Sequence, residues 1–469
     1  MLLNIIRKEI LDTITSPKFV FTFLLCTILI LLSVYTGINN YRSELREYNA
    51  AIALNQKNLE TQPNYSALAG LGTKITKPPQ AMSTITAGIQ SAVGRQASVN
   101  IAYDPNLINS SYESNPVLAI FGDLDLTLIV KIVLSLLAIL FTFDAIVGER
   151  ERGTLKLTLS NRVPRDQLVL GKMIGGFISL SVPLVIPFVI GLIMLLLYPD
   201  LAFTGEDWAR VGVIFSLFIL YLSVFFSLGL FVSSLTGRSS SSLFVLLFIW
   251  VIFIFVIPKT AVIVAGHIKP IPSMHEVTAQ KDAFLQEVQG SSQKEIRDWM
   301  ENNPREGEEP VEEWQEKFRD YIEEYQQNAT ARIDEKNAEL EHEYQSRRRG
   351  QQLLAMRLSR ISPASALTIG SMSIGRTGIQ EHERFLNSIK TYKPIFTKWA
   401  NAKMMQSINF KNPADQQKPD IADMPQHDFT PMSLRESISL ALPDIAVLAL
   451  MIIVFFTGAF VSFLRYDVR

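Results

Sequence analysis

Cysteine is almost absent from this sequence, because Cys26 is the only one among 469 residues. A single thiol cannot form a disulfide within the chain, so every folded domain must be held together by packing alone. Cys26 lies in a long apolar run, where an isolated cysteine normally packs as a small apolar side chain. We therefore expect neither a redox role nor a metal–thiolate site.

The motifs of common catalytic and nucleotide-binding sites are also missing. The sequence contains no G-x-x-x-x-G-K-[ST] phosphate loop, no H-E-x-x-H or G-x-S-x-G element and no C-x-x-C pair. The five histidines lack the spacing of metal ligands: they are His267, His275, His342, His382 and His427. A net charge of −1 gives no basic excess to attract nucleic acid. The sequence predicts no enzyme activity, no directly bound cofactor or metal, and no nucleic-acid partner.

Long apolar runs are what the sequence has in abundance. Six runs of about 20 residues or more are long enough to cross a hydrocarbon core about 30 Å thick. They lie at roughly 18–38, 126–147, 173–197, 211–235, 242–264 and 440–464. We predict an α-helical polytopic membrane protein with six transmembrane helices and a mostly helical extracytoplasmic domain.

Positive residues beside the spans set the predicted orientation. Short loops rich in Lys and Arg stay in the cytoplasm. Arg7, Lys8 and Lys18 therefore place the N-terminus inside, and the arginines of 148–172, 236–239 and 465–469 place those segments inside too. Six crossings with both termini cytoplasmic satisfy every assignment.

The predicted organisation follows from this orientation. The segments are an amphipathic interfacial helix (1–17), transmembrane helix 1 (18–38), a first extracytoplasmic segment (39–125), transmembrane helix 2 (126–147), a cytoplasmic coupling loop (148–172), transmembrane helices 3–5 (173–264), an extracytoplasmic helical domain (265–439), and transmembrane helix 6 with a cytoplasmic tail (440–469).

The N-terminal residues 2–15 show the periodicity of an amphipathic helix. The predicted interfacial residues combine apolar positions at helical spacing with two basic ones: Ile6, Arg7, Lys8, Ile10 and Ile14. Such a helix can lie flat in the inner membrane interface. The alternative is a helical extension of the first span, although Ser16-Pro17 predicts a break between the two.

The extracytoplasmic segments differ from each other. Segment 39–125 begins with a predicted helix at 41–60, whereas 276–300 and 308–360 predict two charged helices joined by a turn at 302–307. A narrow apolar seam runs along the second of these helices and marks a candidate partner-binding hairpin: Trp314, Phe318, Tyr321 and Tyr325. Packing within the hairpin itself is the equal alternative. Residues 411–433, rich in proline, predict an extended strap.

Charged side chains inside the predicted spans are few. Lys131 lies towards the outer end of the second span and Asp144 towards its inner end, so both can reach the interface. The shortage of ionisable groups near the midplane argues against a proton-coupled or ion-coupled carrier.

The loop after the second span carries the richest cluster of Lys and Arg beside any predicted span. It contains alternating acids and bases at Glu149, Arg150, Glu151 and Arg152, followed by Gly153. Alternating Glu and Arg on a cytosolic helix can make charge-assisted contacts across a small protein interface. Gly153 would let the chain turn out of the helix. The alternative is that these charges only anchor the loop at lipid headgroups.

This loop carries a family resemblance. The run Gly148-Glu149-Arg150-Glu151-Arg152-Gly153-Thr154-Leu155, then Leu159-Ser160, Pro164-Arg165 and Gly171-Lys172, resembles the permease subunits of ABC-2-type ABC transporters. The element 358–364, Leu-Ser-Arg-Ile-Ser-Pro-Ala, is similar to a bacterial subgroup with a large extracytoplasmic insertion before the last span.

The resemblance implies a function and a set of partners. The chain would be the membrane-spanning permease subunit of an exporter in the bacterial inner membrane, paired with a second copy or a homologous permease. ATP and Mg²⁺ would bind to a separate cytosolic ATPase. The residues implied to contact or brace that ATPase are Glu149, Arg150, Glu151, Arg152, Gly153, Thr154 and Arg165.

Two other classes of function compete with this interpretation. A structural or signalling membrane protein would bind an envelope partner through the extracytoplasmic hairpin, with or without force relayed from an ATPase. A membrane enzyme acting on lipid or peptide would need a polar cluster at one membrane face, and the sequence assembles none.

Overall fold

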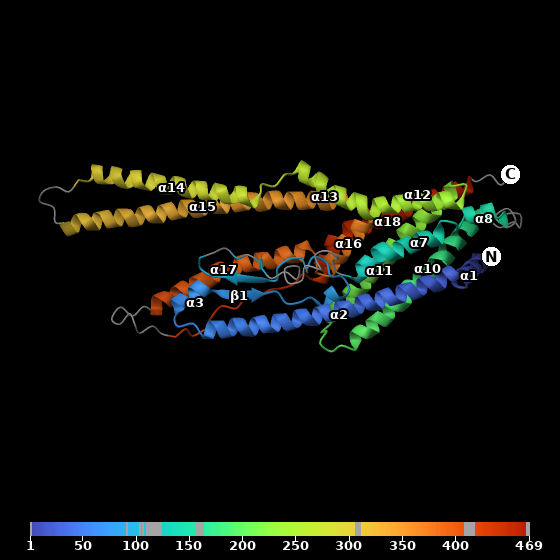
Figure 1. The fold of residues 1–469 in the computed structure, drawn as a ribbon, viewed down its shortest axis with the longest axis horizontal. Helices are drawn as coiled ribbons and strands as arrows, with labels where there is room; N and C mark the ends of the chain where they lie inside the picture. Colours follow the sequence, from blue (N-terminus) through green and yellow to red (C-terminus); the bar gives the residue numbers. More distant parts are fainter. Residues whose placement is uncertain are drawn as a thin grey trace. The chain divides into compact units, whose positions relative to one another are not determined.

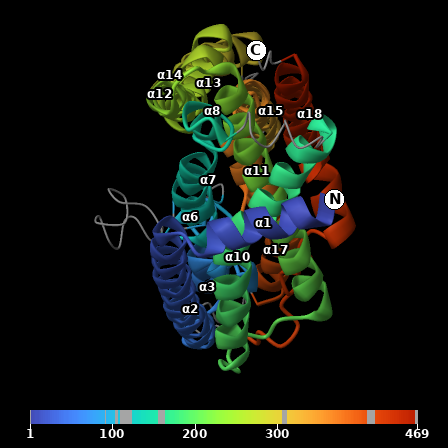
Figure 2. The ribbon, with the colours of Figure 1, turned by 90° about the vertical axis from the view of Figure 1, so that its right-hand side faces the viewer.

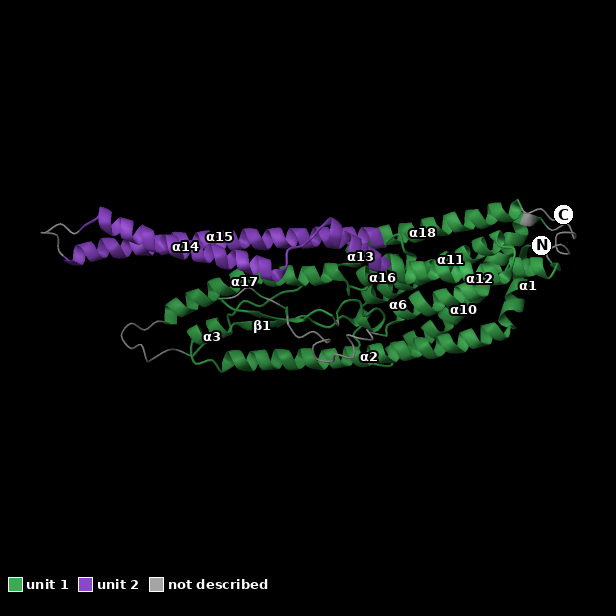
Figure 3. Ribbon diagram, turned by 45° about the horizontal axis from the view of Figure 1, so that its top comes forward, with its two compact units in different colours: residues 1–257, 360–469 green, residues 258–359 purple. Residues whose placement is uncertain are grey.

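The computed structural model describes residues 2–90, 92–102, 105, 107–108, 124–154, 164–304, 311–407 and 418–465. Within these ranges, six helices are long and apolar enough to cross a membrane, which confirms the six predicted spans. The chain forms two compact units, shown in Figure 3: unit 1 comprises residues 1–257 and 360–469, and unit 2 comprises residues 258–359.

The first two helices confirm the predicted break at Ser16-Pro17. Helix α1 spans Leu2–Ile14 and α2 spans Pro17–Glu60. The Ser16 hydroxyl accepts a hydrogen bond from the Phe19 amide, while Pro17 occupies a first-turn position where no amide hydrogen is needed. At 44 residues, α2 is about 66 Å long, so the helix predicted at 41–60 continues the first span without a break.

The second and fifth spans each contain a π-helical segment. The second consists of α6 (Leu126–Ile129), η2 (Val130–Leu134) and α7 (Ser135–Thr142), and the fifth of α12 (Ser239–Val251), η3 (Ile252–Val256) and α13 (Ile257–Ile268). Side chains bond to a carbonyl in each π segment. The Tyr221 hydroxyl donates to the Lys131 carbonyl at 2.7 Å, and the Ser362 hydroxyl donates to the Phe253 carbonyl.

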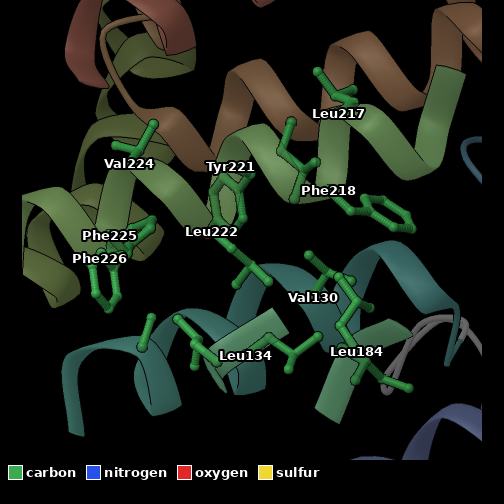
Figure 4. Close-up of a cluster of buried hydrophobic side chains, with 14 of the residues drawn as sticks. Val130, Leu134, Leu184, Leu217, Phe218, Tyr221, Leu222, Val224, Phe225 and Phe226 are labelled. Atoms are coloured by element: carbon green, nitrogen blue, oxygen red, sulfur yellow. The ribbon is translucent and has the colours of Figure 1, made fainter. Parts of the chain in front are cut away.

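The remaining spans are α10 (Arg165–Leu196), α11 (Gly205–Leu235) and α18 (Leu434–Leu464). Capping boxes begin two of them, Thr204 with Asp207 for α11 and Ser433 with Glu436 for α18. The apolar window of α11 is 61% buried, against 17% for α18, so α11 is the central helix. Figure 4 shows its side chains packed over Val130 and Leu134 of the second span.

The part of unit 1 that is predicted to be extracytoplasmic has a core of its own. It contains α3 (Tyr65–Leu71), η1 (Ala81–Thr84) and a three-stranded antiparallel sheet in the order β1 (Thr73–Thr76), β2 (Gln96–Val99), β3 (Leu107–Ile108). Helix α17 (Ile379–Ser407) packs Phe385 and Phe396 against Leu68 and Val99. The small sheet is an addition to the predicted, mostly helical domain. Residues 418–433 contain no helix, in keeping with the predicted strap, and 411–417 lie outside the described residues.

Helix α16 (Pro363–Ile374) belongs to the segment predicted as extracytoplasmic, yet it packs against α11 and α18. Gly370 permits the contact, because a β-carbon there would lie 3.1 Å from Leu217 and 3.4 Å from Asp444. Helix α16 was therefore predicted as part of the outer domain, but it packs within the bundle of spans.

Unit 2 confirms the predicted helical hairpin. Helices α14 (Met274–Asn302) and α15 (Val311–Ser359) pack on each other, and residues 305–310 between them lie outside the described residues.

Figure 1 shows how unit 1 is polarised along its length. Helix α1, helix α8 (Val147–Glu151) and the C-terminal end of α18 lie at one end, and α3, β1 and α17 extend at the other. A chain that crosses the membrane six times returns to the side where it began, so α1 and the end of α18 are expected at the same end.

Candidate functional site

Four segments meet at the end of unit 1 that holds both chain termini. They are α1, α8, the first turns of α10 and the turn between α11 and α12. Seen from this end in Figure 2, α1 lies across α10 rather than along it. The highly charged loop predicted to bind a cytosolic partner thus lies beside the predicted interfacial helix.

Lys172 joins three of these helices. Its ammonium on α10 lies 3.0 Å from Glu9 Oε1 of α1 and 2.7 Å from Glu149 Oε1 of α8, and the side chain is only 6% exposed. Charge pairs withdrawn from water attract each other strongly, and removing one partner leaves the others uncompensated. Lys172 therefore anchors both the interfacial helix and the charged segment to the third span.

Two glycines seat α1 on α10. A β-carbon at Gly171 would lie 2.6 Å from Ile5, and one at Gly175 would lie 2.9 Å from both Ile6 and Glu9. The Gly171-x-x-x-Gly175 spacing is therefore used for packing within the chain, because only small residues let the two helices approach so closely.

The predicted interfacial residues fall on different sides of α1. Ile6 and Ile10 are half-buried, whereas Arg7, Lys8 and Ile14 are exposed. Further apolar surface remains exposed on the helix, with Leu3 at 78% and Leu11 at 52%. An amphipathic helix with both charged and apolar residues exposed suits a membrane interface, so its interfacial role stays a prediction with structural support.

Helix α8 is held from its other side by α11 and α12. The Ser233 hydroxyl accepts hydrogen bonds from the Ile146 and Val147 amides at 3.1 and 3.2 Å. The Glu151 carboxylate accepts bonds from the amide and hydroxyl of Ser239, where α12 begins. An acid at a helix N-terminus satisfies unpaired amides and favours the helix dipole. These contacts fix α8 relative to the fourth and fifth spans.

The end of α8 is closed by local hydrogen bonds. Arg152 Nε donates to the Gly148 carbonyl at 3.1 Å, and the Thr154 hydroxyl donates to the Glu149 carbonyl at 3.2 Å. Gly153 has φ = +74°, a conformation that glycine adopts without strain. The predicted turn at Gly153 is therefore confirmed.

The structure divides the predicted coupling residues into two groups. Glu149 is half-buried and contacts Lys172, and Glu151 is exposed but bonds to Ser239, so both acids brace α8. Arg150, Arg152 and Thr154 are exposed. Residues 155–163 lie outside the described residues. Arg165 is the first residue of α10, and its side chain also lies outside them.

The aromatic residues predicted to bind a partner pack within the hairpin. Trp299 of α14 lies against Trp314, Phe318 and Tyr321 of α15, with ring centroids 6.0, 5.4 and 5.1 Å apart, and Tyr325 follows Tyr321 at 6.4 Å. All are half-buried, so they stabilise the hairpin. Their use by a partner stays a prediction. Trp299 was not predicted because it lies on α14, whereas the apolar periodicity lies on α15.

Arg210 was also missed by the sequence interpretation. This fully buried guanidinium lies near the start of α11, at the predicted outer end of the span bundle. It donates to the Ile374 and Met432 carbonyls at 2.6 and 2.7 Å and to the Ser437 hydroxyl at 2.8 Å. It also pairs with Glu206 at 2.7 Å. Nearby, Arg376 pairs with Asp207 at 2.6 Å.

Asp444 corrects the expectation that the charged residues within the predicted spans are Lys131 and Asp144. Asp444 on α18 is fully buried and pairs with Arg360 at 2.7 Å. Asp444 already lies inside the predicted run 440–464. For Arg210 the available signal was the capping box that begins α11 at Gly205 and so puts Arg210 inside the helix. Asp144 does lie at a helix end and pairs with Lys18 at 3.1 Å.

The described residues contain no group of three or more His, Cys, Asp or Glu side chains able to hold a metal ion. At α8, a short charged helix is braced from two sides and has exposed arginines. Together with six helices that are long and apolar enough to cross a membrane, this arrangement belongs to a helical polytopic membrane protein.

Comparison with known proteins agrees with this class. The family described as ABC-2 family transporter protein matches residues 3–468, so the chain belongs to the ABC-2 transporter family. A protein of Pseudomonas aeruginosa named probable ABC transporter permease protein NosY is 33% identical over 150 residues, covering 31% of this chain and 54% of that protein. A protein of the same name from Stutzerimonas stutzeri is 30% identical over 123 residues, covering 26% and 45%. The chain thus matches about half the length of these curated relatives.

Proposed function

We propose that this chain is the membrane-spanning subunit of an ABC exporter and that it receives force from a separate cytosolic ATPase through α8 and the turn after it. The observation that carries the proposal is the braced position of α8. Its acids are occupied by Lys172 and Ser239, while Arg150 and Arg152 are exposed at the end of the bundle that holds both termini.

The contacts of α8 give a route for the displacement. ATP and Mg²⁺ would bind on the ATPase, and closure of that partner would push α8. The Lys172 pairs would pass the movement to α1 and α10, while Ser233 and Glu151 would pass it to α11 and α12. One short segment would thereby bias several spans between two arrangements.

The proposed setting is the bacterial inner membrane with both termini in the cytoplasm. Arg150, Arg152, Arg238 and Lys8 all belong to segments at the same end of unit 1, which supports this orientation. A second copy or a homologous permease would complete the transporter. Export is the proposed direction.

A second candidate function rests on unit 2. Helices α14 and α15 contain 29 and 49 residues, or about 43 and 73 Å of helix, far more than a connection between two spans needs. Most of their charged side chains are exposed. An envelope protein bound along this hairpin would make the chain a force relay or a structural protein.

Co-purification from native membranes in mild detergent tests the main proposal. We expect a cytosolic ATPase to be identified by mass spectrometry with the wild-type protein and to be depleted with Arg150→Ala/Arg152→Ala. The matched control is Lys317→Ala/Arg319→Ala, which removes two exposed cations from α15 instead. If no ATPase accompanies the wild type while an envelope protein does, the second candidate is favoured.

A further inference from the structure

An open pocket of about 630 Å³ lies between the last turns of α11 and α18. It belongs entirely to unit 1, at the end that carries α8. None of the coupling residues lines it. Its walls come from residues 231–235 of α11 and 457–465 of α18.

The inner wall of the pocket is formed where the two helices touch. A β-carbon at Gly458 would lie 2.7 Å from the Phe231 ring, so glycine lets this ring rest directly on α18. Phe231 also stacks on Phe455 with ring centroids 6.5 Å apart. From this contact the pocket extends towards the helix ends at Leu235 and Leu464.

The lining changes from apolar to polar along the pocket. Phe231 and Val461 supply apolar surface, Ser234 and Ser462 supply hydroxyls, and Arg465 supplies a cation at the end of α18. The nine residues from Thr457 to Arg465 span about 12 Å along the helix axis. Arg465 is exposed and forms no ion pair within the described part of the chain.

We propose that this pocket binds one anionic phospholipid from the leaflet on the α8 side. The acyl chain would lie against Phe231 and Val461, and the phosphate would be held by Arg465 and the Ser462 hydroxyl. The Ser234 hydroxyl donates to the Phe231 carbonyl at 2.6 Å and only adds polar surface. Both helices are membrane spans that end here, so the pocket lies at the boundary between hydrocarbon and headgroups. Basic pockets between spans on the cytoplasmic side recognise anionic headgroups.

A lipid fits the lining better than a free anion does. Inorganic phosphate would use the cation and the Ser462 hydroxyl but would leave the apolar wall in water. Ser234 also adjoins Ser233, which caps α8, so a bound lipid would support the part of α11 that holds the coupling segment. The assignment to the cytoplasmic leaflet rests on the proposed orientation, whereas lipid binding itself does not.

Native mass spectrometry of the purified full-length permease tests the proposal without any ATPase. Phosphatidylglycerol and phosphatidylcholine with identical acyl chains are titrated in detergent, with inorganic phosphate as competitor. We expect phosphatidylglycerol to bind more tightly. Arg465→Gln should weaken its binding about fivefold, because one basic residue near a headgroup contributes about 1 kcal/mol.

Two further variants make the test specific. Lys8→Gln removes an exposed cation from the same end of unit 1 outside the pocket, and it should leave the affinity unchanged. Ser462→Phe fills the pocket and should weaken both lipids, while the exposed Arg465→Gln avoids any risk to folding. Equal binding of the two lipids, or an unaffected Arg465→Gln variant, would overturn the proposal. Displacement of phosphatidylglycerol by an equal concentration of phosphate would do the same, since it would indicate a site for small anions.

Discussion

The two ends of the span bundle are each organised around a buried cation, but the two cations are held differently. At the α8 end, Lys172 contacts two carboxylates, Glu9 and Glu149, from two other helices. At the outer end, Arg210 has one carboxylate partner, and its other bonds go to the Ile374 and Met432 carbonyls and the Ser437 hydroxyl.

This difference separates a movable end from a fixed end. An ammonium is a compact charge on a flexible stem, and its ion pairs tolerate rotation, whereas a guanidinium fixes its partners through a planar set of donors. The Arg210 contacts also reach segments 164 and 222 residues away in sequence, so they lock the outer ends of α11, α16 and α18 together. We infer that α8 moves together with the span ends it contacts, while the opposite ends of the spans are held fixed.

The largest expected effect is on the fixed end. Arg210→Met should lower the free energy of unfolding by roughly 4 kcal/mol, because two buried carbonyls and a hydroxyl lose a charged donor. Arg210→Lys should restore only part of the loss, since lysine cannot reproduce the planar geometry. Thermal unfolding of the detergent-purified variants measures both. Equal Tm values for Arg210→Met and wild type would show that Arg210 does not hold α11, α16 and α18 together.

Lys77 is a third buried cation and differs from Lys172 and Arg210, because it forms no ion pair within 4 Å among the described residues. It is 6% exposed beside β1, and burial lowers the pKa of its ammonium from 10.5 to about 8, although the nearby Glu381 charge opposes the shift. The unfolded chain therefore binds more protons between about pH 8 and 10.5, and stability rises with pH across that window. Lys77→Met should stabilise the protein at pH 7, by up to about 3 kcal/mol, and abolish the rise. A pH series of unfolding curves decides this, and a persistent rise in the variant would assign it to another group.

The movable end should be less sensitive. Lys172→Met leaves Glu9 and Glu149 without their shared cation, but both acids are partly exposed, so we expect a loss of about 2 kcal/mol. Adding Glu9→Gln and Glu149→Gln to this variant should recover most of the loss, because no uncompensated charge then remains. The Tm values of the single and triple variants test this, and an equal loss in both would point to packing rather than charge.

The smallest effect on stability is expected at the exposed arginines. Arg150→Ala/Arg152→Ala removes exposed side chains and the Arg152 hydrogen bond to the Gly148 carbonyl, so the free energy of unfolding, measured by thermal unfolding, should fall by no more than about 1 kcal/mol. Glu149→Gln should lower it, since Glu149 contacts Lys172. A marked loss of stability in the arginine variant would mean that these residues brace α8 instead of facing a partner.

Local patterns in the sequence were enough to predict the spans and the short-range features. Apolar runs located all six crossings, Ser16-Pro17 located the break after α1, and Gly153 located the turn after α8. Each of these depends on residues close together in the chain. The 12-residue helix α16 and the strands of two to four residues are too short to show a comparable signal.

The long-range contacts could not be predicted in the same way. Lys172 was noted in the Gly171-Lys172 pair of the family resemblance, but its ion pair was not predicted because its partner Glu9 lies 163 residues away. Arg210 lies one residue before the apolar run assigned to the fourth span, and its partners lie on segments around residues 374 and 432. Pairing such charges requires the three-dimensional arrangement of the helices.

Site-specific photo-crosslinking tests the central claim most directly. A benzoylphenylalanine at Arg152 on the α8 segment is compared, in native membranes, with one at Lys317 on the hairpin. We predict a crosslink from position 152 to a cytosolic ATPase and no crosslink from position 317 to that ATPase. If position 152 crosslinks only to lipid while the ATPase is present in the membranes, α8 is a headgroup anchor and the coupling account is wrong.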